Sequence, residues 1–214
     1  GGLLTPKVHF ISDQKLILED LGANNTRNLY FWEDFGKGLA EQHSWQSEDF
    51  GFTSNNFIGD TPQINSYRSD GFDFYTEFRY LYQAQRAFDK GFLDKQWVIA
   101  MERFCQRLPE MIPFQKPSLL HGDLWSGNLL SNQQGMPCLI DPAVYYGWRE
   151  SDLAMTKMFG GFSPAFLDSY EEYFPLEPGF EERVHYYNLY HWLNHLNLFG
   201  DSYLPQVQAI LRAF

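Results

Sequence analysis

Apolar residues recur at helical spacing over much of the chain. In the segment 71–90, Phe74 and Phe78 fall on one face of a helix. The same spacing predicts further helices over 28–43, 97–108, 166–174, 181–199 and 206–214. We expect Pro109 and Pro113 to end the helix over 97–108, because proline lacks the backbone N–H that a helix interior uses.

Strand-like patterns are short and few. The segments 8–11 and 15–21 flank a turn and predict an antiparallel hairpin near the start of the chain. The segment 50–67 is rich in Gly, Asn, Ser and Thr, which predicts a loop. No internal repeat and no low-complexity tract interrupts this order.

One stretch departs from the helical pattern. It has an apolar lead-in at 119–120, a compact polar loop at 121–128 and a short apolar exit. A turn-rich segment, 131–135, precedes a second strand-like run that ends on the carboxylate of Asp141. Two short strands that bracket polar loops are therefore expected here.

Composition limits the class of protein. The chain has 214 residues, of which 44% are hydrophobic and 18% aromatic, so a sizeable core is available and a disordered chain is excluded. The net charge of −11 argues against a nucleic-acid binder, because a phosphate backbone needs a surface of Lys and Arg. An acidic surface does not by itself name a partner.

The two cysteines, Cys105 and Cys138, are too few and too far apart for a disulfide framework or a zinc site. We expect both to be packing residues of a reduced, cytoplasmic protein. The sequence opens without a basic-then-apolar signal segment, and no run approaches the roughly 20 apolar residues that a membrane span needs. We therefore expect no membrane partner.

The loop at 121–128 has the composition of a phosphoryl-transfer site. Asp123 and Asn128 are five positions apart, and Asp141 closes the next strand-like run. Kinases use this spacing for an Asp that takes the acceptor proton, an Asn that holds Mg²⁺ and a second Asp on the metal. His-Gly-Asp alone would be a weak signal, because loop Asp and Asn usually cap turns. The full combination favours phosphoryl transfer over a capped loop before a hairpin.

The chain resembles the fructosamine-3-kinase (ketosamine-3-kinase) family, in the aminoglycoside-phosphotransferase branch of the protein-kinase-like fold. Two runs carry the resemblance: His121-Gly-Asp-Leu-Trp-Ser-Gly-Asn128 and Ile140-Asp-Pro-Ala-Val-Tyr-Tyr-Gly-Trp-Arg-Glu-Ser-Asp-Leu-Ala-Met155. The similarity extends nearly to the end of the chain. Trp148 is a departure, since family members usually carry a polar residue there.

The resemblance implies an α+β, protein-kinase-like fold with a mainly helical C-terminal lobe over 23–214. Residues 1–22 would be the last hairpin and the hinge of an apparently truncated N-terminal lobe. The hinge residues Glu19, Asp20 and Leu21 would meet the adenine through their backbone. Family members carry a phosphate-covering loop and a phosphate-gripping Lys ahead of this point, and whether this chain is active without them stays open.

The resemblance also assigns further site residues. We expect Trp125 and His121 at the substrate, with Trp125 stacked on the apolar face of a sugar; a role for Trp125 as a structural plug fits equally well. Ser151 and Asp152 precede an apolar run and suit the N-terminus of a helix. Asp152 would tie that helix back to the catalytic loop, and Arg149 and Glu150 would brace the same corner. His43, on a helix face, is expected to be a satisfied core residue.

These implications define an ATP- and Mg²⁺-dependent kinase acting on the 3-hydroxyl of small-molecule or protein-bound ketosamines, such as fructosamine and ribulosamine adducts. Asp123 would orient and deprotonate that hydroxyl. The phosphorylated adduct decomposes, so the role would be deglycation. An aminoglycoside or other small-molecule phosphotransferase and an inactive, truncated lobe remain alternatives. The sequence does not choose among acceptors or oligomeric states.

Overall fold

The computed structural model describes residues 2–22 and 26–214. Its strands are short and form two-stranded antiparallel pairs, β1 with β2, β3 with β4, β5 with β8 and β6 with β7. Their bounds are β1 (Val8–Ser12), β2 (Lys15–Leu18), β3 (Asn56–Ile58), β4 (Thr61–Gln63), β5 (Ser118–Leu120), β6 (Leu129–Ser131), β7 (Pro137–Leu139) and β8 (Tyr145–Gly147).

Helices make up about half of the described chain. The α-helices are α1 (Phe31–His43), α2 (Gly71–Tyr75), α3 (Tyr82–Asp89), α4 (Lys95–Met111), α5 (Arg149–Met155), α6 (Pro164–Tyr173), α7 (Phe180–Phe199) and α8 (Leu204–Leu211). A π-helical segment, η1 (Thr76–Leu81), joins α2 to α3, and single 3₁₀ turns are η2 (Ser126–Asn128) and η3 (Asp201–Tyr203).

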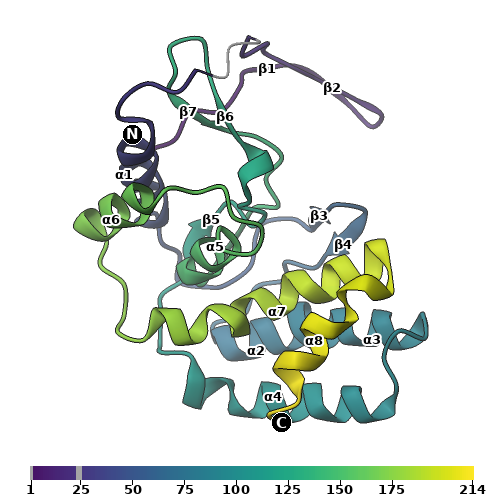
Figure 1. Cartoon of the computed structure of the whole chain (residues 1–214). Helices are drawn as coiled ribbons and strands as arrows, with labels where there is room; N and C mark the ends of the chain where they lie inside the picture. Colours follow the sequence, from purple (N-terminus) through teal and green to yellow (C-terminus); the bar gives the residue numbers. More distant parts are fainter. Residues whose placement is uncertain (1, 23–25) are drawn as a thin grey trace.

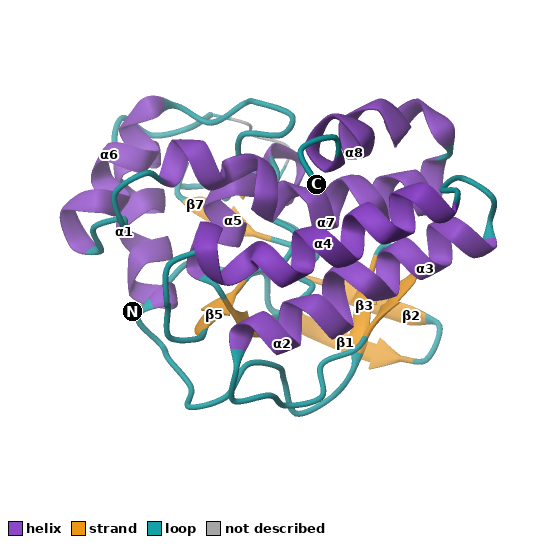
Figure 2. Ribbon diagram, turned by 90° about the horizontal axis from the view of Figure 1, so that it is seen from below, coloured by secondary structure: helices purple, strands orange, loops and turns teal. Residues whose placement is uncertain are grey.

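The long helix α7 runs across the middle of the molecule, and α2, α3 and α4 lie on one side of it (Figure 1). On its other side lie α5 and the paired strands β5 and β8, with the pair α1 and α6 beyond them. Figure 2, seen from below, shows α4 beside α2 and α3. Short strands with helices packed around them give the α+β class that the sequence predicted.

The helical periodicity located the long helices to within a few residues. The predicted segment 71–90 is one continuous helical run whose middle part, η1, has π-helical hydrogen bonding. The predicted segment 28–43 forms a helix only from Phe31, because the Asn28 side chain accepts the N–H of Tyr30 and shapes a turn before it. The structure confirms the segment 181–199 almost residue for residue.

The prediction that Pro109 ends its helix was wrong. Helix α4 continues through Pro109 to Met111. Pro109 lies in the last turn, so its missing N–H removes one hydrogen bond only. The N–H of Ile112 still reaches the carbonyl of Leu108 at 2.9 Å, which closes the helix. Proline therefore removes one helical hydrogen bond here without stopping the last turn from forming.

The prediction of a loop over 50–67 was only partly correct. This segment contains the hairpin β3–β4, with Ile58 paired to Thr61 across a turn at Gly59. Its strands have only three residues each, too few for an alternating pattern to be recognised in a sequence. Gly59 has a φ of +56°, a conformation that glycine adopts without steric cost.

The hairpin β1–β2 is exposed on both faces and projects away from the helices (Figure 1). Predicted strand 15–21 is shorter than expected and ends at Leu18. Apolar side chains such as Ile11, 73% exposed, and Ile17, 53% exposed, meet solvent. The expected boundary between residues 22 and 23 lies partly outside the described residues, and so does Gly1.

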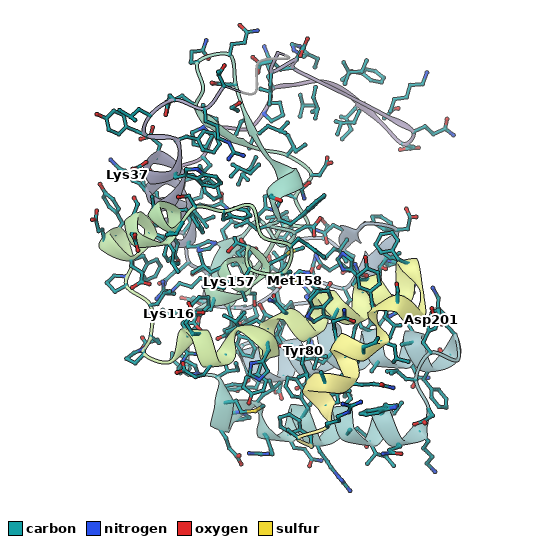
Figure 3. The ribbon with its side chains drawn as sticks, in the orientation of Figure 1. Lys37, Tyr80, Lys116, Lys157, Met158 and Asp201 are labelled. Atoms are coloured by element: carbon teal, nitrogen blue, oxygen red, sulfur yellow. The ribbon has the colours of Figure 1, made fainter. Side chains whose placement is uncertain are left out.

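Aromatic residues fill the core between α2, α5 and α7. Trp148, the departure from the family pattern, is 1% exposed and stacks on Tyr75 with ring centroids 4.0 Å apart. Tyr80, labelled in Figure 3, is fully buried and donates to the carbonyl of Tyr186 on α7 at 3.1 Å. The large aromatic fraction of the sequence therefore serves chiefly to join helices.

Candidate active site

Two polar loops meet where the sequence placed its catalytic motif. The catalytic loop, 121–128, leaves β5, and the metal loop, 140–144, returns to β8, the partner of β5. The N–H of Ala143 donates to the carbonyl of His121 at 2.9 Å, and the N–H of Ile140 donates to the carbonyl of Asn128 at 3.1 Å. Backbone pairing thus brings together two loops that the intervening hairpin β6–β7 separates along the chain.

Asp123 and Asn128 touch each other within the catalytic loop. The amide nitrogen of Asn128 donates to the backbone carbonyl of Asp123 at 2.8 Å and to its carboxylate at 3.1 Å. Burial raises the pKa of Asp123 to about 6, although the hydrogen bond from Asn128 opposes that rise. Since the nitrogen of Asn128 is used, its carbonyl oxygen is the atom that it can offer to a cation.

Asp141 has an exposed carboxylate at the start of the metal loop. Its φ of +51° is positive, unlike that of any other non-glycine residue among those described, and Asp tolerates this left-handed region better than most residues. Within the described part of the chain its carboxylate has no hydrogen-bond or ion-pair partner. The backbone turn therefore leaves both carboxylate oxygens free for a ligand.

These residues fit a magnesium ion by donor chemistry. Carboxylate and amide oxygens are the hard ligands that Mg²⁺ uses, and Mg²⁺ usually takes only one or two of them together with waters and phosphate oxygens. Within residues 2–22 and 26–214 no cluster of three or more His, Cys, Asp or Glu forms a metal cage. A site shared between Asn128, Asp141 and a nucleotide is consistent with both facts.

His121 lies between the two loops and is 3% exposed. Its Nδ1 accepts the N–H of Asp123 at 3.3 Å, and its Nε2 reaches the carbonyl of Ile140 at 2.9 Å. Burial lowers the pKa of His121, which favours the neutral ring with its proton on Nε2. We expected His121 to contact the substrate; instead its ring is enclosed and joins the catalytic loop to the metal loop.

Asp152 accepts three hydrogen bonds in a fully enclosed position. The backbone N–H groups of His121 and Gly122 donate to it at 2.7 and 2.9 Å, and His43 Nε2 lies 3.2 Å away. Burial raises the pKa of Asp152, but these partners more than compensate and hold it below its ordinary value. The carboxylate connects α5 to the catalytic loop, as expected for a supporting residue.

The helix that carries Asp152 starts earlier than the sequence suggested. We expected Ser151 and Asp152 at its N-terminus, whereas α5 begins at Arg149 and its first turn has no side-chain cap. The Asp152 carboxylate serves the catalytic loop instead. His43, 0% exposed between Asp152 and Tyr170, is the satisfied core residue that we predicted.

Arg149 supports the site from behind. Its guanidinium donates to Tyr170 Oη at 3.1 Å, to the carbonyl of Phe174 at 2.9 Å and to that of Pro175. It therefore anchors the end of α6. We expected Glu150 at the same corner, but Glu150 points to α7 and pairs with Arg183 at 2.8 Å.

Trp125 is 39% exposed and forms part of a cavity of about 390 Å³ that opens onto Asp123. Its ring lies over Gly127, where an added Cβ would come within 2.2 Å of it. The remaining wall is mostly apolar and comes from the hairpin β3–β4, the end of α5 and the turn after it, the end of α7, and η3: Ile58, Gly59, Met155, Phe159, Asn194, His195, Leu198, Phe199 and Tyr203.

Most of this wall was missed in the sequence. The helical spacing over 181–199 did not single out His195 or the aromatic residues near the end of α7 as parts of a site. His195 Nδ1 lies 2.8 Å from the carbonyl of His191, which leaves Nε2 as the free ring nitrogen. The sequence feature that could have indicated this wall is a helical face with aromatic residues and one His. Only the tertiary structure shows that this face lines the same cavity as Asp123.

The expected hinge lies apart from this cavity. Glu19, Asp20 and Leu21 line a second cavity of about 230 Å³ together with residues of the β6–β7 turn. The N–H of Glu19 donates to the carbonyl of Lys7 at 2.8 Å, and Asp20 accepts the N–H of Gly22 at 2.8 Å. Adenine binding by the backbone of this segment stays a prediction.

Comparisons with known proteins agree with the motif. A family model described as fructosamine kinase matches residues 6–214. A protein named probable ketoamine kinase from Enterococcus faecium is 43% identical over 196 residues, which cover 87% of this chain and 71% of that protein. Against four further relatives of the same name, the matched part makes up 61 to 65% of the relative's length.

The fold agrees as well. The structure of a candidate fructosamine-3-kinase from Thermobifida fusca superposes with a TM-score of 0.89 at 34% identity, over 97% of this chain and 72% of that one. An ADP-bound aminoglycoside phosphotransferase gives a TM-score of 0.60 at 14% identity, over 98% of this chain and 75% of that one, which shows a shared fold alone. The fold is therefore protein-kinase-like, and the chain belongs to the fructosamine kinase family.

Proposed function

We propose that this protein is an ATP-dependent kinase that phosphorylates the 3-hydroxyl of ketosamines. The observation that carries the proposal is the position of Asp123: it contacts Asn128, lies beside the metal loop and opens onto a sugar-sized cavity. Phosphoryl transfer requires these three features together, because the protein contributes mainly positioning and electrostatic stabilisation.

In this proposal Asn128 and Asp141 hold Mg²⁺ through their oxygens, and the hinge 19–21 receives the adenine. The metal, when bound, neutralises charge on the phosphates of ATP. Asp123 accepts a hydrogen bond from the acceptor hydroxyl, orients its oxygen toward the γ-phosphorus and takes its proton. His121 and Asp152 keep the catalytic loop in place without touching the reactants.

The lining of the acceptor cavity supports a ketosamine over an aminoglycoside. Asp123 is the only carboxylate among the described residues that line it, and the rest of the wall is chiefly aromatic and aliphatic. A polycationic aminoglycoside would gain little from such a wall. A ketosamine offers a sugar ring whose C–H face can pack on aromatic side chains, together with a single amine.

The biological role follows from the chemistry of the product. A ketosamine phosphorylated on its 3-hydroxyl decomposes and frees the amine, so we propose deglycation of proteins or small amines.

We also propose that 1–22 and 23–214 are parts of different lobes. No helix among the described residues has the length and apolar character needed to cross a bilayer.

Binding of the nucleotide tests the metal assignment. We expect calorimetric titration of the 214-residue chain with Mg-ATP to give saturable binding. The variant Asp141→Ala is expected to lose about tenfold or more in affinity, because one of the two metal ligands is removed. Equal binding by both proteins would contradict the role of Asp141, and no binding by the wild type would favour an inactive lobe.

The acceptor is tested separately. With Mg-ATP and either fructosyl-lysine or kanamycin, we expect phosphate transfer to fructosyl-lysine only. Transfer to kanamycin alone would contradict the ketosamine assignment and support the aminoglycoside alternative. The position of the new phosphate, determined by ³¹P–¹H NMR, checks the 3-hydroxyl.

Substitutions at Trp125 test whether its ring stacks on the sugar or serves as a structural plug. If its ring packs on the sugar, Trp125→Ala is expected to raise the KM for fructosyl-lysine by about tenfold, or about 1.4 kcal/mol, with Trp125→Phe in between. The melting temperature should change little, since the ring is 39% exposed. An unchanged KM with a lowered melting temperature would show that Trp125 is a plug.

A further inference from the structure

The hairpin β3–β4 reaches the metal loop from a distant part of the sequence. Gln63, at the end of β4, donates from Nε2 to the carbonyl of Ala143 at 3.0 Å. Asn56, its strand partner on β3, donates from Nδ2 to the carbonyl of Val144 at 2.8 Å. Both acceptors directly follow Asp141 and Pro142, so the hairpin holds the backbone just beyond the proposed metal ligand.

Gln63 has no freedom to turn away from this contact. It is 1% exposed, and its Oε1 accepts the hydroxyl proton of Tyr190 at 2.8 Å. Its Nε2 also donates to Asn56 Oδ1 at 2.9 Å. Since both ends of the side-chain amide are bonded in a buried position, rotation would leave buried polar atoms unsatisfied.

The opposite side of Ala143 is fixed by the catalytic loop. Its N–H donates to the carbonyl of His121 at 2.9 Å. Gly122, with a φ of +82°, lies so close that an added Cβ would come within 2.1 Å of the Ala143 oxygen. Ala143 is thus held between Gln63 on one side and the start of the catalytic loop on the other.

A buried arginine fixes the segment after Gln63. Arg79, on η1, is 0% exposed and donates to the carbonyl of Ile64 at 2.7 Å and to Asn65 Oδ1 at 2.8 Å. Its guanidinium lies 4.1 Å from the ring centroid of Tyr145, and no carboxylate pairs with it in the described chain. A buried charge that binds backbone and amide oxygens strongly disfavours movement of this segment.

The same hairpin also meets the acceptor cavity. Ile58 and Gly59, at its turn, line the same cavity as Trp125 and Asp123. One small element therefore contacts the proposed acceptor site at its tip and the metal loop through its base. Both contacts come from a segment that the catalytic motif does not include.

We infer that Gln63 is a positioning residue for the metal loop: it fixes the backbone at Ala143 and so the direction in which Asp141 presents its carboxylate. It touches neither the substrate nor the proposed metal. The expected effect of Gln63 on nucleotide binding rests on the proposed function. The effect of Gln63 on the position of the metal loop does not depend on that function.

The test compares two buried glutamines in the full chain. Gln63→Met removes the hydrogen bonds with little change in length, and Gln115→Met does the same at a site where Nε2 binds Tyr187 Oη at 2.8 Å. Hydrogen exchange of the segment 140–147 is measured without nucleotide. Binding of ADP is then measured by calorimetry with and without Mg²⁺, using Asp141→Ala as the reference.

We expect Gln63→Met to speed exchange in 140–147 by about tenfold and to weaken binding of Mg-ADP by about 10- to 100-fold, the range found when partners of metal ligands are removed. Affinity for metal-free ADP should stay the same. Gln115→Met should lower the melting temperature by about as much as Gln63→Met does. It should leave hydrogen exchange over 140–147 and affinity for Mg-ADP unchanged.

Two outcomes would overturn the inference. One is hydrogen exchange over 140–147 in Gln63→Met that matches the wild type, and the other is an equal loss of Mg-ADP affinity in Gln63→Met and Gln115→Met. If Asp141→Ala binds Mg-ADP as well as the wild type does, the metal assignment in the proposed function fails. Hydrogen exchange then still decides whether Gln63 holds the loop, so the two failures are distinguishable.

Discussion

Replacement of Asp123 by Asn is expected to lower turnover with a ketosamine by about 10²–10⁴-fold, the contribution typical of a positioned proton acceptor. An amide keeps the size of the carboxylate but cannot accept the hydroxyl proton. The hydrogen bond from Asn128 to the backbone carbonyl of residue 123 does not involve the side chain and persists. The fold and the affinity for Mg-ATP should therefore change little.

The measurement is a steady-state assay of phosphate transfer, with the melting temperature recorded for each protein. Asp168→Asn is the matched control, because Asp168 is an exposed aspartate on α6, outside the site. It removes the same charge and should leave turnover unchanged. Turnover of Asp123→Asn within a few-fold of the wild type would remove Asp123 from its assigned role.

Replacement of Asp152 by Ala is expected to cost about 3–5 kcal/mol of unfolding free energy, the range found when one partner of a buried polar pair is removed. The change leaves the N–H groups of His121 and Gly122 without an acceptor in a buried position. Turnover should fall as well, because these residues precede Asp123. Urea denaturation measures the first effect and the kinase assay the second.

The pH dependence of stability supplies an independent check. The folded-state pKa of Asp152 is lowered, so its contribution is present above the unfolded value of about 3.9 and is lost as pH falls through the folded value. Below about pH 4, Asp152→Ala should therefore lose less stability than the wild type on further acidification. Parallel acid profiles would contradict the assigned burial and bonding of this carboxylate.

Local sequence patterns predicted the parts of the fold that depend on residues close together in the chain. Helices such as α7 follow from apolar spacing, and their ends shifted by one to three residues where a side chain such as Asn28 shapes a turn. The contact between Asp123 and Asn128 was also predictable, because both belong to one short loop closed by a 3₁₀ turn. Short strands without an alternating pattern, such as β3 and β4, were not.

The sequence by itself determined the family resemblance, the helical class and the proposed catalytic and metal positions, since these depend on residue types at fixed short spacings. Only the tertiary structure decided what surrounds them. It enclosed His121 between two loops, turned Asp152 toward backbone N–H groups, and brought Gln63 to Ala143, 80 positions later in the chain. Such contacts depend on how elements far apart in the sequence pack together, and no local pattern along the chain predicts which of these elements meet.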